Sequence, residues 1–195
     1  GAVPAARAPA DGYTLFLGTT SESVLVPLLQ KTNYDPAKDF VPVSILSVSV
    51  GAIVVHPSVP AHNLKELVAY AKANPGKLNY GSAGAGSSSN LTGELFKHLA
   101  GLPDIVHIPY KSATPGITDL VAGHVHMLSA SPVELKPFVD SSKVKPLGIS
   151  GKERSKHLPK VPTISETMNS PVVATYNGLL APTGTPQAVI DAISQ

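Results

Sequence analysis

The sequence of 195 residues contains no cysteine. Without a thiol, the chain can form no disulfide, no thiolate nucleophile and no zinc–thiolate site. Charged residues are also scarce, at 14% of the chain, and the formal net charge is only +2. The lysines are scattered, and the longest basic cluster, residues 151–156, is interrupted by Glu153. No nucleic-acid partner is therefore expected.

Long apolar runs are absent as well. No stretch approaches the roughly 20 residues that span a bilayer, so no direct membrane insertion is expected. The first residues show neither the charged nor the apolar region of a signal peptide, and we expect any such peptide to have been removed or to lie outside this chain. Residues 3–9 are typical of the tail of a helix, so we also expect a preceding N-terminal element. The hydrophobic content of 43% allows one domain, or two small ones, with a real core.

Short apolar segments alternate with amphipathic segments along the chain. Strands are predicted at residues 13–17, 40–49, 52–56, 78–80, 105–110, 124–128, 145–150 and 175–181. Helical patterns occupy most of the intervals between them. Because strands and helices take turns, the sequence predicts an α/β fold with mostly parallel sheets.

Capping residues indicate where several helices begin. Asn63 is predicted to cap a helix, with Glu66 in the capping-box position. Thr114 and Pro115 are predicted to start another, as cap and first helical residue. The helix that follows residue 87 is predicted to bury one apolar stripe, formed by Leu91, Leu95, Phe96 and Leu99.

The most informative segment is residues 78–99, LNYGSAGAGSSSNLTGELFKHL. A predicted strand runs into a glycine-rich loop and a block of hydroxyl and amide side chains, and then a helix begins. Glycine lets the backbone come close to a ligand, while a helix start offers unpaired N–H groups and a partial positive charge. The segment therefore predicts a binding site for a small anionic molecule.

Known nucleotide fingerprints do not fit this loop. A P-loop needs a lysine where Ser87 stands, and a dinucleotide fingerprint needs a third glycine where Ser89 stands. The G-x-S-x-G nucleophile elbow is absent. Two interpretations are left: an oxyanion site that does not bind nucleotides, or a tight turn that needs glycine only for packing.

No residue pattern indicates a catalytic or metal centre. Acidic residues do not form pairs, and His107 is expected to be packed within a strand. His124 and His126 are predicted to share one face of a strand, but no third ligand lies nearby in sequence. We therefore expect a binding protein rather than an enzyme, with no cofactor and no bound metal.

Eight ordered segments of the chain resemble the Bug family of TctC-like proteins, the periplasmic solute receptors of tripartite tricarboxylate transporters. They are residues 11–15 (DGYTL), 34–43 (YDPAKDFVPV), 56–60 (HPSVP), 64–67 (LKEL), 71–84 (AKANPGKLNYGSAG), 108–111 (IPYK), 158–163 (LPKVPT) and 181–186 (APTGTP). The resemblance runs nearly from end to end, and the segments recur at the family's spacing.

The resemblance implies a two-lobed periplasmic binding protein, type II-like, whose lobes close on a small mono- or dicarboxylate as a Venus flytrap does. It also implies a periplasmic location and the membrane components of a tripartite transporter as partners. Lobe 1 is expected to comprise residues 1–105 plus 178–195, incomplete at both chain ends. Lobe 2 is expected to comprise residues 106–177.

Three loops that each follow a predicted strand and precede a helix are expected to line the ligand cleft. The resemblance implies that the first two border it from lobe 1 and that the third faces it from lobe 2. The predicted ligand-binding residues are Gly18, Thr19, Thr20, Ser21, Ser82, Ala83, Gly84, Gly86, Ser87, Ser88, Ser129, Ala130 and Ser131.

Two alternatives stay open. An α/β hydrolase-like enzyme acting on a small carboxylate ester would need Ser82, Ser87 or Ser131 within hydrogen-bond reach of a histidine, either His107 or His126. A truncated paralogue that binds nothing would show no stabilisation by any carboxylate.

Overall fold

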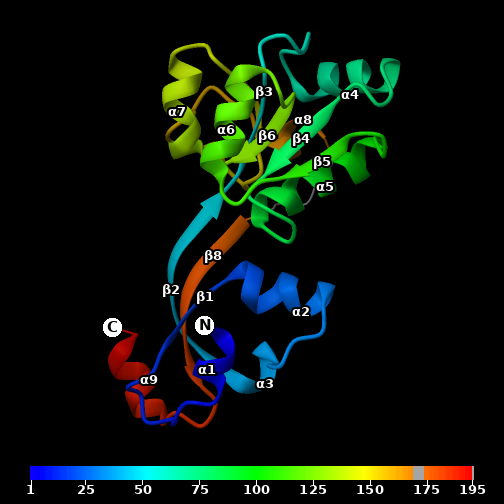
Figure 1. Ribbon diagram of the computed structural model, residues 1–195. Helices are drawn as coiled ribbons and strands as arrows, with labels where there is room; N and C mark the ends of the chain where they lie inside the picture. Colours follow the sequence, from blue (N-terminus) through cyan, green and yellow to red (C-terminus); the bar gives the residue numbers. More distant parts are fainter. Residues whose placement is uncertain (169–173, 195) are drawn as a thin grey trace. The chain divides into compact units, whose positions relative to one another are not determined.

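The computed structural model describes residues 1–168 and 174–194 (Figure 1). The chain forms two compact units, Gly1–Ser49 with Thr175–Gln195, and Val50–Ala174. Among the described residues, the structure contains no helix with the length and hydropathy needed to cross a membrane.

The larger unit is built on a five-stranded sheet with the strand order β5-β4-β6-β3-β7. β4 runs parallel to β5 and β6, whereas β3 runs antiparallel to β6 and β7. In chain order the strands are β3 (Ala52–Val55), β4 (Asn79–Ser82), β5 (Val106–Pro109), β6 (Met127–Ala130) and β7 (Lys145–Ile149).

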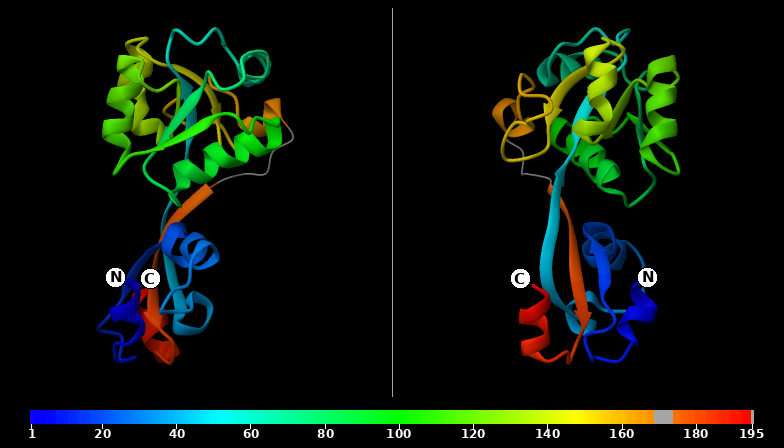
Figure 2. Two further views of the ribbon diagram at one scale, coloured as in Figure 1. Left: turned by 45° about the vertical axis from the view of Figure 1, so that its right-hand side comes forward. Right: turned by 90° about the vertical axis from the view of Figure 1, so that its left-hand side faces the viewer.

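Helices cover both faces of this sheet (Figure 2). On one face, α4 (Leu64–Ala73), α5 (Ser88–Ala100) and α8 (Ile164–Thr167) share a core; on the other lie α6 (Ala113–Ala122) and α7 (Pro132–Asp140). β3 serves both cores, because Ile53 and Val55 belong to the first while Ala52 and Val54 belong to the second. This is the alternation that the two-residue period of a strand produces.

The smaller unit contains a three-stranded sheet with the order β1-β8-β2, in which β1 and β8 are antiparallel. Its buried core is small and consists of Ala2, Ala5, Phe16 and Phe40, with the two aromatic rings 5.2 Å apart. The elements of this unit are α1 (Ala2–Ala6), β1 (Phe16–Thr19), the π-helix η1 (Ser21–Leu25), α2 (Val26–Leu29), α3 (Pro36–Asp39), β2 (Phe40–Val50), β8 (Ala174–Pro182) and α9 (Gln187–Ile193).

The predicted helix starts are partly confirmed. Asn63 caps α4, and its side chain accepts the Glu66 N–H at 2.9 Å. α6 begins at Ala113, so the predicted start at Thr114 was too late, and Pro115 lies inside the first turn. A proline is tolerated there because the N–H groups of the first turn have no partner within the helix.

The division into units differs from the predicted one, which placed residues 1–105 plus 178–195 in one lobe and 106–177 in the other. The structure puts the boundary after Ser49 instead. The physical reason is the pairing of β4 with both β5 and β6, which holds residues 50–105 in the same sheet as the segment that follows. Strand pairing between distant segments is not visible in a linear pattern.

The prediction of mostly parallel sheets holds only in part. The sheet of the larger unit is mixed, because β3 runs against both of its neighbours. β3 is joined to β4 through α4, yet it lies between β6 and β7 in the sheet. Alternation along the chain therefore did not reveal the direction of this strand.

The buried face of α5 is also different from the predicted stripe. Only Phe96 of the four predicted residues is buried, together with Thr92, Gly93 and Ala100. The reason lies at Gly93, where an added Cβ would be 2.8 Å from Cδ2 of the Tyr80 ring and closer still to its Cε2. The missing side chain lets the helix pack directly on Tyr80, and this contact sets which face is buried.

Candidate functional site

Each of the three predicted loops does follow a strand and precede a helix: β1 leads to η1, β4 to α5 and β6 to α7. The predicted distribution over two lobes is wrong, however. The loops after β4 and β6 lie in the same unit, and residues 18–21 lie in the other. Because β4 and β6 are parallel neighbours, their carboxyl ends meet at one edge of the sheet.

The loop after β4 needs glycine for its backbone conformation. Gly84 and Gly86 have φ angles of 113° and 75°, which other residues rarely adopt. Ser87 is the N-cap of α5, and its Oγ accepts the Asn90 N–H at 3.2 Å. The sequence prediction of a glycine loop that opens a helix is confirmed.

Several N–H groups of this loop are bound within the loop itself. Ser82 Oγ accepts the Gly84 N–H at 3.2 Å, and Asn90 Oδ1 accepts the Gly86 N–H at 3.0 Å. The Ala83 N–H donates to Ser89 Oγ at 2.9 Å. These three groups are therefore not offered to a ligand.

Three other N–H groups remain available. Within the described residues, the backbone N–H groups of Ala85, Ser88 and Ser89 have no hydrogen-bond partner. Ala85 is exposed and the two serines are half-buried, so solvent reaches this part of the loop. The three N–H groups lie at the N-terminal, positive end of the 13-residue helix α5. An anion is favoured at this end of a helix. The loop can thus receive an anion without any charged side chain.

Two predicted binding serines lie beneath the surface. Ser82 is 1% exposed and supports the loop from behind through Gly84. Ser129 is 3% exposed, and its Oγ makes no hydrogen bond to any described residue. A Cβ on Gly51 would lie 2.9 Å from this Oγ and 3.6 Å from Thr92 Oγ1, so the glycine leaves room beside the hydroxyl.

The other two residues of the loop after β6 differ from each other. Ala130 is buried at the end of β6. Ser131 is half-buried at the N-terminus of α7, and its N–H donates to Glu134 Oε2 at 3.3 Å. The first turn of α7 is thus capped by the protein's own carboxylate.

Residues 18–21 are also engaged within their own unit. The Thr19 N–H donates to Glu22 Oε2 at 3.2 Å, and Thr19 Oγ1 bonds to the same oxygen. The Ser21 N–H donates to Thr19 Oγ1 at 3.2 Å, and Thr20 Oγ1 accepts the Tyr176 N–H at 2.9 Å. Thr19 thus binds the carboxylate of Glu22, a residue of the same unit.

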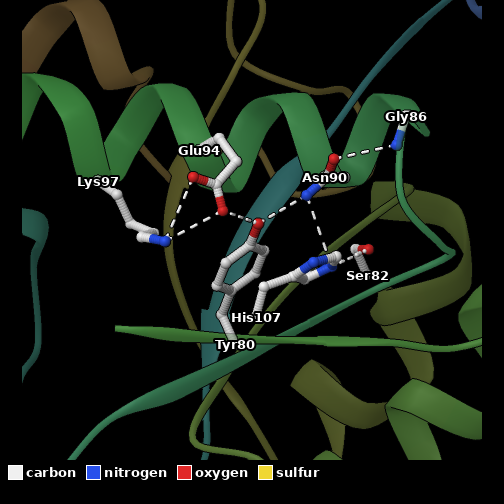
Figure 3. Close-up of polar contacts among 7 residues, drawn as sticks. All are labelled: Tyr80, Ser82, Gly86, Asn90, Glu94, Lys97 and His107. Atoms are coloured by element: carbon white, nitrogen blue, oxygen red, sulfur yellow. Dashed lines mark hydrogen bonds and ion pairs between the residues drawn. The ribbon is translucent and has the colours of Figure 1, made fainter. Parts of the chain in front are cut away.

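A chain of polar contacts links the glycine loop to the middle of α5 (Figure 3). Glu94 accepts hydrogen bonds from Lys97 Nζ at 3.1 Å and from the Tyr80 hydroxyl at 2.5 Å. Asn90 Nδ2 donates to the Tyr80 oxygen at 2.7 Å and lies 3.5 Å from His107 Nε2. His107 Nε2 in turn lies 2.7 Å from Ser82 Oγ. The His107 ring stacks on Tyr80 with the centroids 4.7 Å apart.

The electrostatics of this chain favour a neutral imidazole beside an ionised carboxylate. Burial lowers the pKa of His107 below its usual 6.5, Lys97 acts in the same direction, and Glu94 opposes them. Burial alone would raise the pKa of the Glu94 carboxyl, but the hydrogen bonds from Tyr80 and Lys97 outweigh it and hold that pKa below its usual range. Burial and Glu94 raise the pKa of the Tyr80 hydroxyl.

Sequence reasoning missed most of this chain. It assigned no role to Tyr80, Asn90 or Glu94, and it expected His107 only to be packed, which the stacking on Tyr80 confirms. One signal was available: residues 90, 94 and 97 have the spacing of one helix face. Nothing in the sequence pairs that face with β4 and β5.

The geometric condition set for a hydrolase is met, because Ser82 has a histidine within reach. The pair is nevertheless poorly suited to nucleophilic catalysis. Ser82 Oγ is buried and bonded to the Gly84 N–H. In the described parts of the chain, no carboxylate bonds to the other ring nitrogen of His107, so the third group of a triad is missing.

No metal centre is found in the described ranges, which contain no group of three or more potential ligands. His124 and His126 precede β6 rather than lying within it, contrary to the prediction. His124 contacts Asp119 at 3.5 Å, and His126 contacts Asn79 Oδ1 at 2.7 Å.

Comparison with known proteins places the chain in a family. All 195 residues match the family model described as "Tripartite tricarboxylate transporter family receptor". The chain is 34% identical over 191 residues to the "UPF0065 protein in tcbD-tcbE intergenic region" of Pseudomonas sp. (strain P51), an alignment covering 97% of this chain and 56% of that protein. The chain thus spans about half the length of the curated relatives it matches.

Solved structures agree with this result. Rpa4515 of R. palustris with adipate is 33% identical, with a TM-score of 0.81 over 97% of this chain and 64% of that one. MatC (Rpa3494) of Rhodopseudomonas palustris with bound malate is 30% identical, with a TM-score of 0.79 over 96% and 64%. Two further relatives are described as a periplasmic transporter and as the periplasmic binding protein BugD. The chain therefore has the α/β fold of periplasmic binding proteins, and it belongs to the family of tripartite tricarboxylate transporter receptors, which are solute-binding proteins and not enzymes.

Proposed function

We propose that this chain captures a small carboxylate in the periplasm and belongs to a receptor that delivers it to the membrane components of a tripartite transporter. The ligand is a mono- or dicarboxylate of the size of malate or adipate, the compounds bound to two solved relatives. The carboxylate docks on the loop after β4, at the start of α5.

The unpaired N–H groups of Ala85, Ser88 and Ser89 carry this proposal. A carboxylate accepts hydrogen bonds from such groups with a strength of about 1.5–3 kcal/mol each, because one partner is charged. The partial positive charge at the start of α5 adds to this attraction. The buried Ser129 hydroxyl, which lacks a partner among the described residues, is a further donor on the α5 side of the sheet.

The test is a thermal-shift screen followed by calorimetric titration of the full chain. The panel contains mono- and dicarboxylates, including malate and adipate, with adipamide as the uncharged match of adipate. A ligand at one hundred times its Kd is expected to stabilise the fold by about 2.7 kcal/mol, whereas adipamide has no effect. If no carboxylate raises the melting temperature, the non-binding paralogue is the better description.

Replacing Ser129 with alanine is expected to separate stability from binding. Without ligand, removal of an unpaired buried hydroxyl leaves stability unchanged or raises it by about 1 kcal/mol. With ligand, the loss of one hydrogen bond to a carboxylate is expected to weaken binding by about tenfold or more. Urea unfolding and calorimetry measure the two effects. A variant that is less stable but binds with unchanged affinity would show that Ser129 serves the core alone.

A further inference from the structure

The direction of the hydrogen bonds can be traced from the glycine loop inwards. Because Asn90 Oδ1 accepts the Gly86 N–H at 3.0 Å, the orientation of the amide group is determined. Its Nδ2 therefore donates towards the Tyr80 oxygen at 2.7 Å and towards His107 Nε2 at 3.5 Å. The Tyr80 oxygen can accept, since its own hydrogen goes to Glu94. His107 Nε2 is best matched as an acceptor too, because an Nε2–H would face the Asn90 Nδ2–H.

An accepting Nε2 means a neutral imidazole with its proton on Nδ1. Ser82 Oγ then donates its hydrogen to Nε2 at 2.7 Å and keeps a lone pair for the Gly84 N–H at 3.2 Å. The charged and titratable groups that face the imidazole are Glu94 and Lys97 on α5 and Tyr80 on β4. Burial keeps the pKa of His107 below 6.5, so the neutral form dominates at neutral pH.

We propose that His107 is a positioning residue for solute capture. Acting through Ser82 and Asn90, the neutral imidazole keeps the N–H groups of Gly84 and Gly86 turned into the loop. The N–H groups of Ala85, Ser88 and Ser89 are thereby left for the carboxylate. The inference rests on the proposed function and adds a pH dependence to it.

Protonation of His107 reverses this arrangement. Nε2 then donates to Ser82 Oγ, and the serine hydrogen must turn to the Gly84 carbonyl oxygen, which lies 3.1 Å away. Two donors, Nε2–H of His107 and Nδ2–H of Asn90, then face each other. The Asn90 amide is then repelled, so the Gly86 N–H loses its acceptor, while Ser82 Oγ can still accept the Gly84 N–H through its second lone pair. Solute affinity should therefore be full above pH 6.5 and fall as the pH drops through the pKa of His107.

Variants at His107 test the proposal in the full chain. In His107→Gln, the side-chain carbonyl oxygen can replace Nε2 as acceptor but cannot be protonated. In His107→Leu, the acceptor is lost. With malate and adipate as probes at pH 7.5, we expect about tenfold weaker binding for His107→Leu and less than threefold for His107→Gln. His126→Gln is the matched control, because His126 is also buried enough to have a lowered pKa but contacts Asn79 rather than the loop.

The decisive measurement is the same titration at pH 5.5. Wild-type affinity is expected to fall further than that of His107→Gln, while His126→Gln falls like the wild type. Protonation of the solute itself affects all three proteins equally, so their difference reports on His107. An identical fall in the wild type and His107→Gln would overturn the proposal.

A second readout needs no solute and no variant. In the ¹⁵N NMR spectrum of the wild-type protein, the Gly84 and Gly86 amide resonances should follow the titration of the His107 imidazole. Resonances that do not follow it contradict the positioning role. If they do follow it but neither malate nor adipate binds, the positioning role is supported and it is the proposed function that fails.

Discussion

Replacing Gly93 with alanine is expected to destabilise the protein by about 1–3 kcal/mol, the cost of overpacking a well-filled core. On helix propensity alone the same change would stabilise α5 by about 1 kcal/mol. The added methyl group would lie 2.8 Å from Cδ2 of Tyr80, whose side chain is completely buried and cannot move aside. Urea unfolding measures the change, and a gain in stability would contradict the packing shown here.

A double-mutant cycle with Tyr80→Leu tests the cause of this effect. Leucine removes the ring atoms that the methyl group would meet, so Gly93→Ala should cost clearly less in the Tyr80→Leu background. The coupling between the two sites is expected to be about 1–2 kcal/mol, as for residues in direct contact. Equal costs in both backgrounds would mean that the Tyr80 ring is not the obstacle.

Replacing Gly84 with alanine is expected to weaken carboxylate binding about a hundredfold. The φ angle of 113° strains any residue with a side chain, at a cost of about 1–3 kcal/mol that the loop can avoid by changing its conformation. An added Cβ would also lie 3.2 Å from the Tyr110 carbonyl oxygen. A rearranged loop loses two hydrogen bonds to the solute at about 1.5 kcal/mol each, or about tenfold apiece. Calorimetric titration with malate and adipate measures the loss.

Gly76→Ala provides the matched control. Gly76 also has a positive φ angle, 73°, and nothing lies within 4 Å of an added Cβ. The variant therefore also places a side chain at a positive φ angle, without disturbing the loop after β4. It should lose some stability and keep its affinity. Loss of affinity in both variants would point to general destabilisation instead of a local effect at Gly84.

Local features of the fold could be predicted because neighbouring residues determine them. The cap at Asn63 needs only a side chain three residues away from its partner N–H. The loop at Gly84 and Gly86 was recognisable for the same reason, since the ability to adopt a positive φ angle is a property of glycine itself. Most of the predicted strands lie close to observed ones, although their ends differ by several residues. The last predicted strand, at 175–181, falls within β8.

Features that depend on distant segments could not be predicted. The boundary after Ser49 follows from the pairing of β4 with β5 and β6. The buried face of α5 follows from the contact between Gly93 and Tyr80. Because a helical period fits several faces of one helix, the partner decides which of them is buried.

The sequence by itself determined the family, the α/β class and the glycine loop that opens α5, since all three can be recognised from short segments of neighbouring residues. Only the tertiary structure decided which distant side chain contacts the residues that hold this loop. His107 lies 25 residues from Ser82 in the chain, yet the parallel register of β4 and β5 brings the two to hydrogen-bond distance. A hydrogen bond depends on separation in space, and for segments this far apart only packing sets that separation.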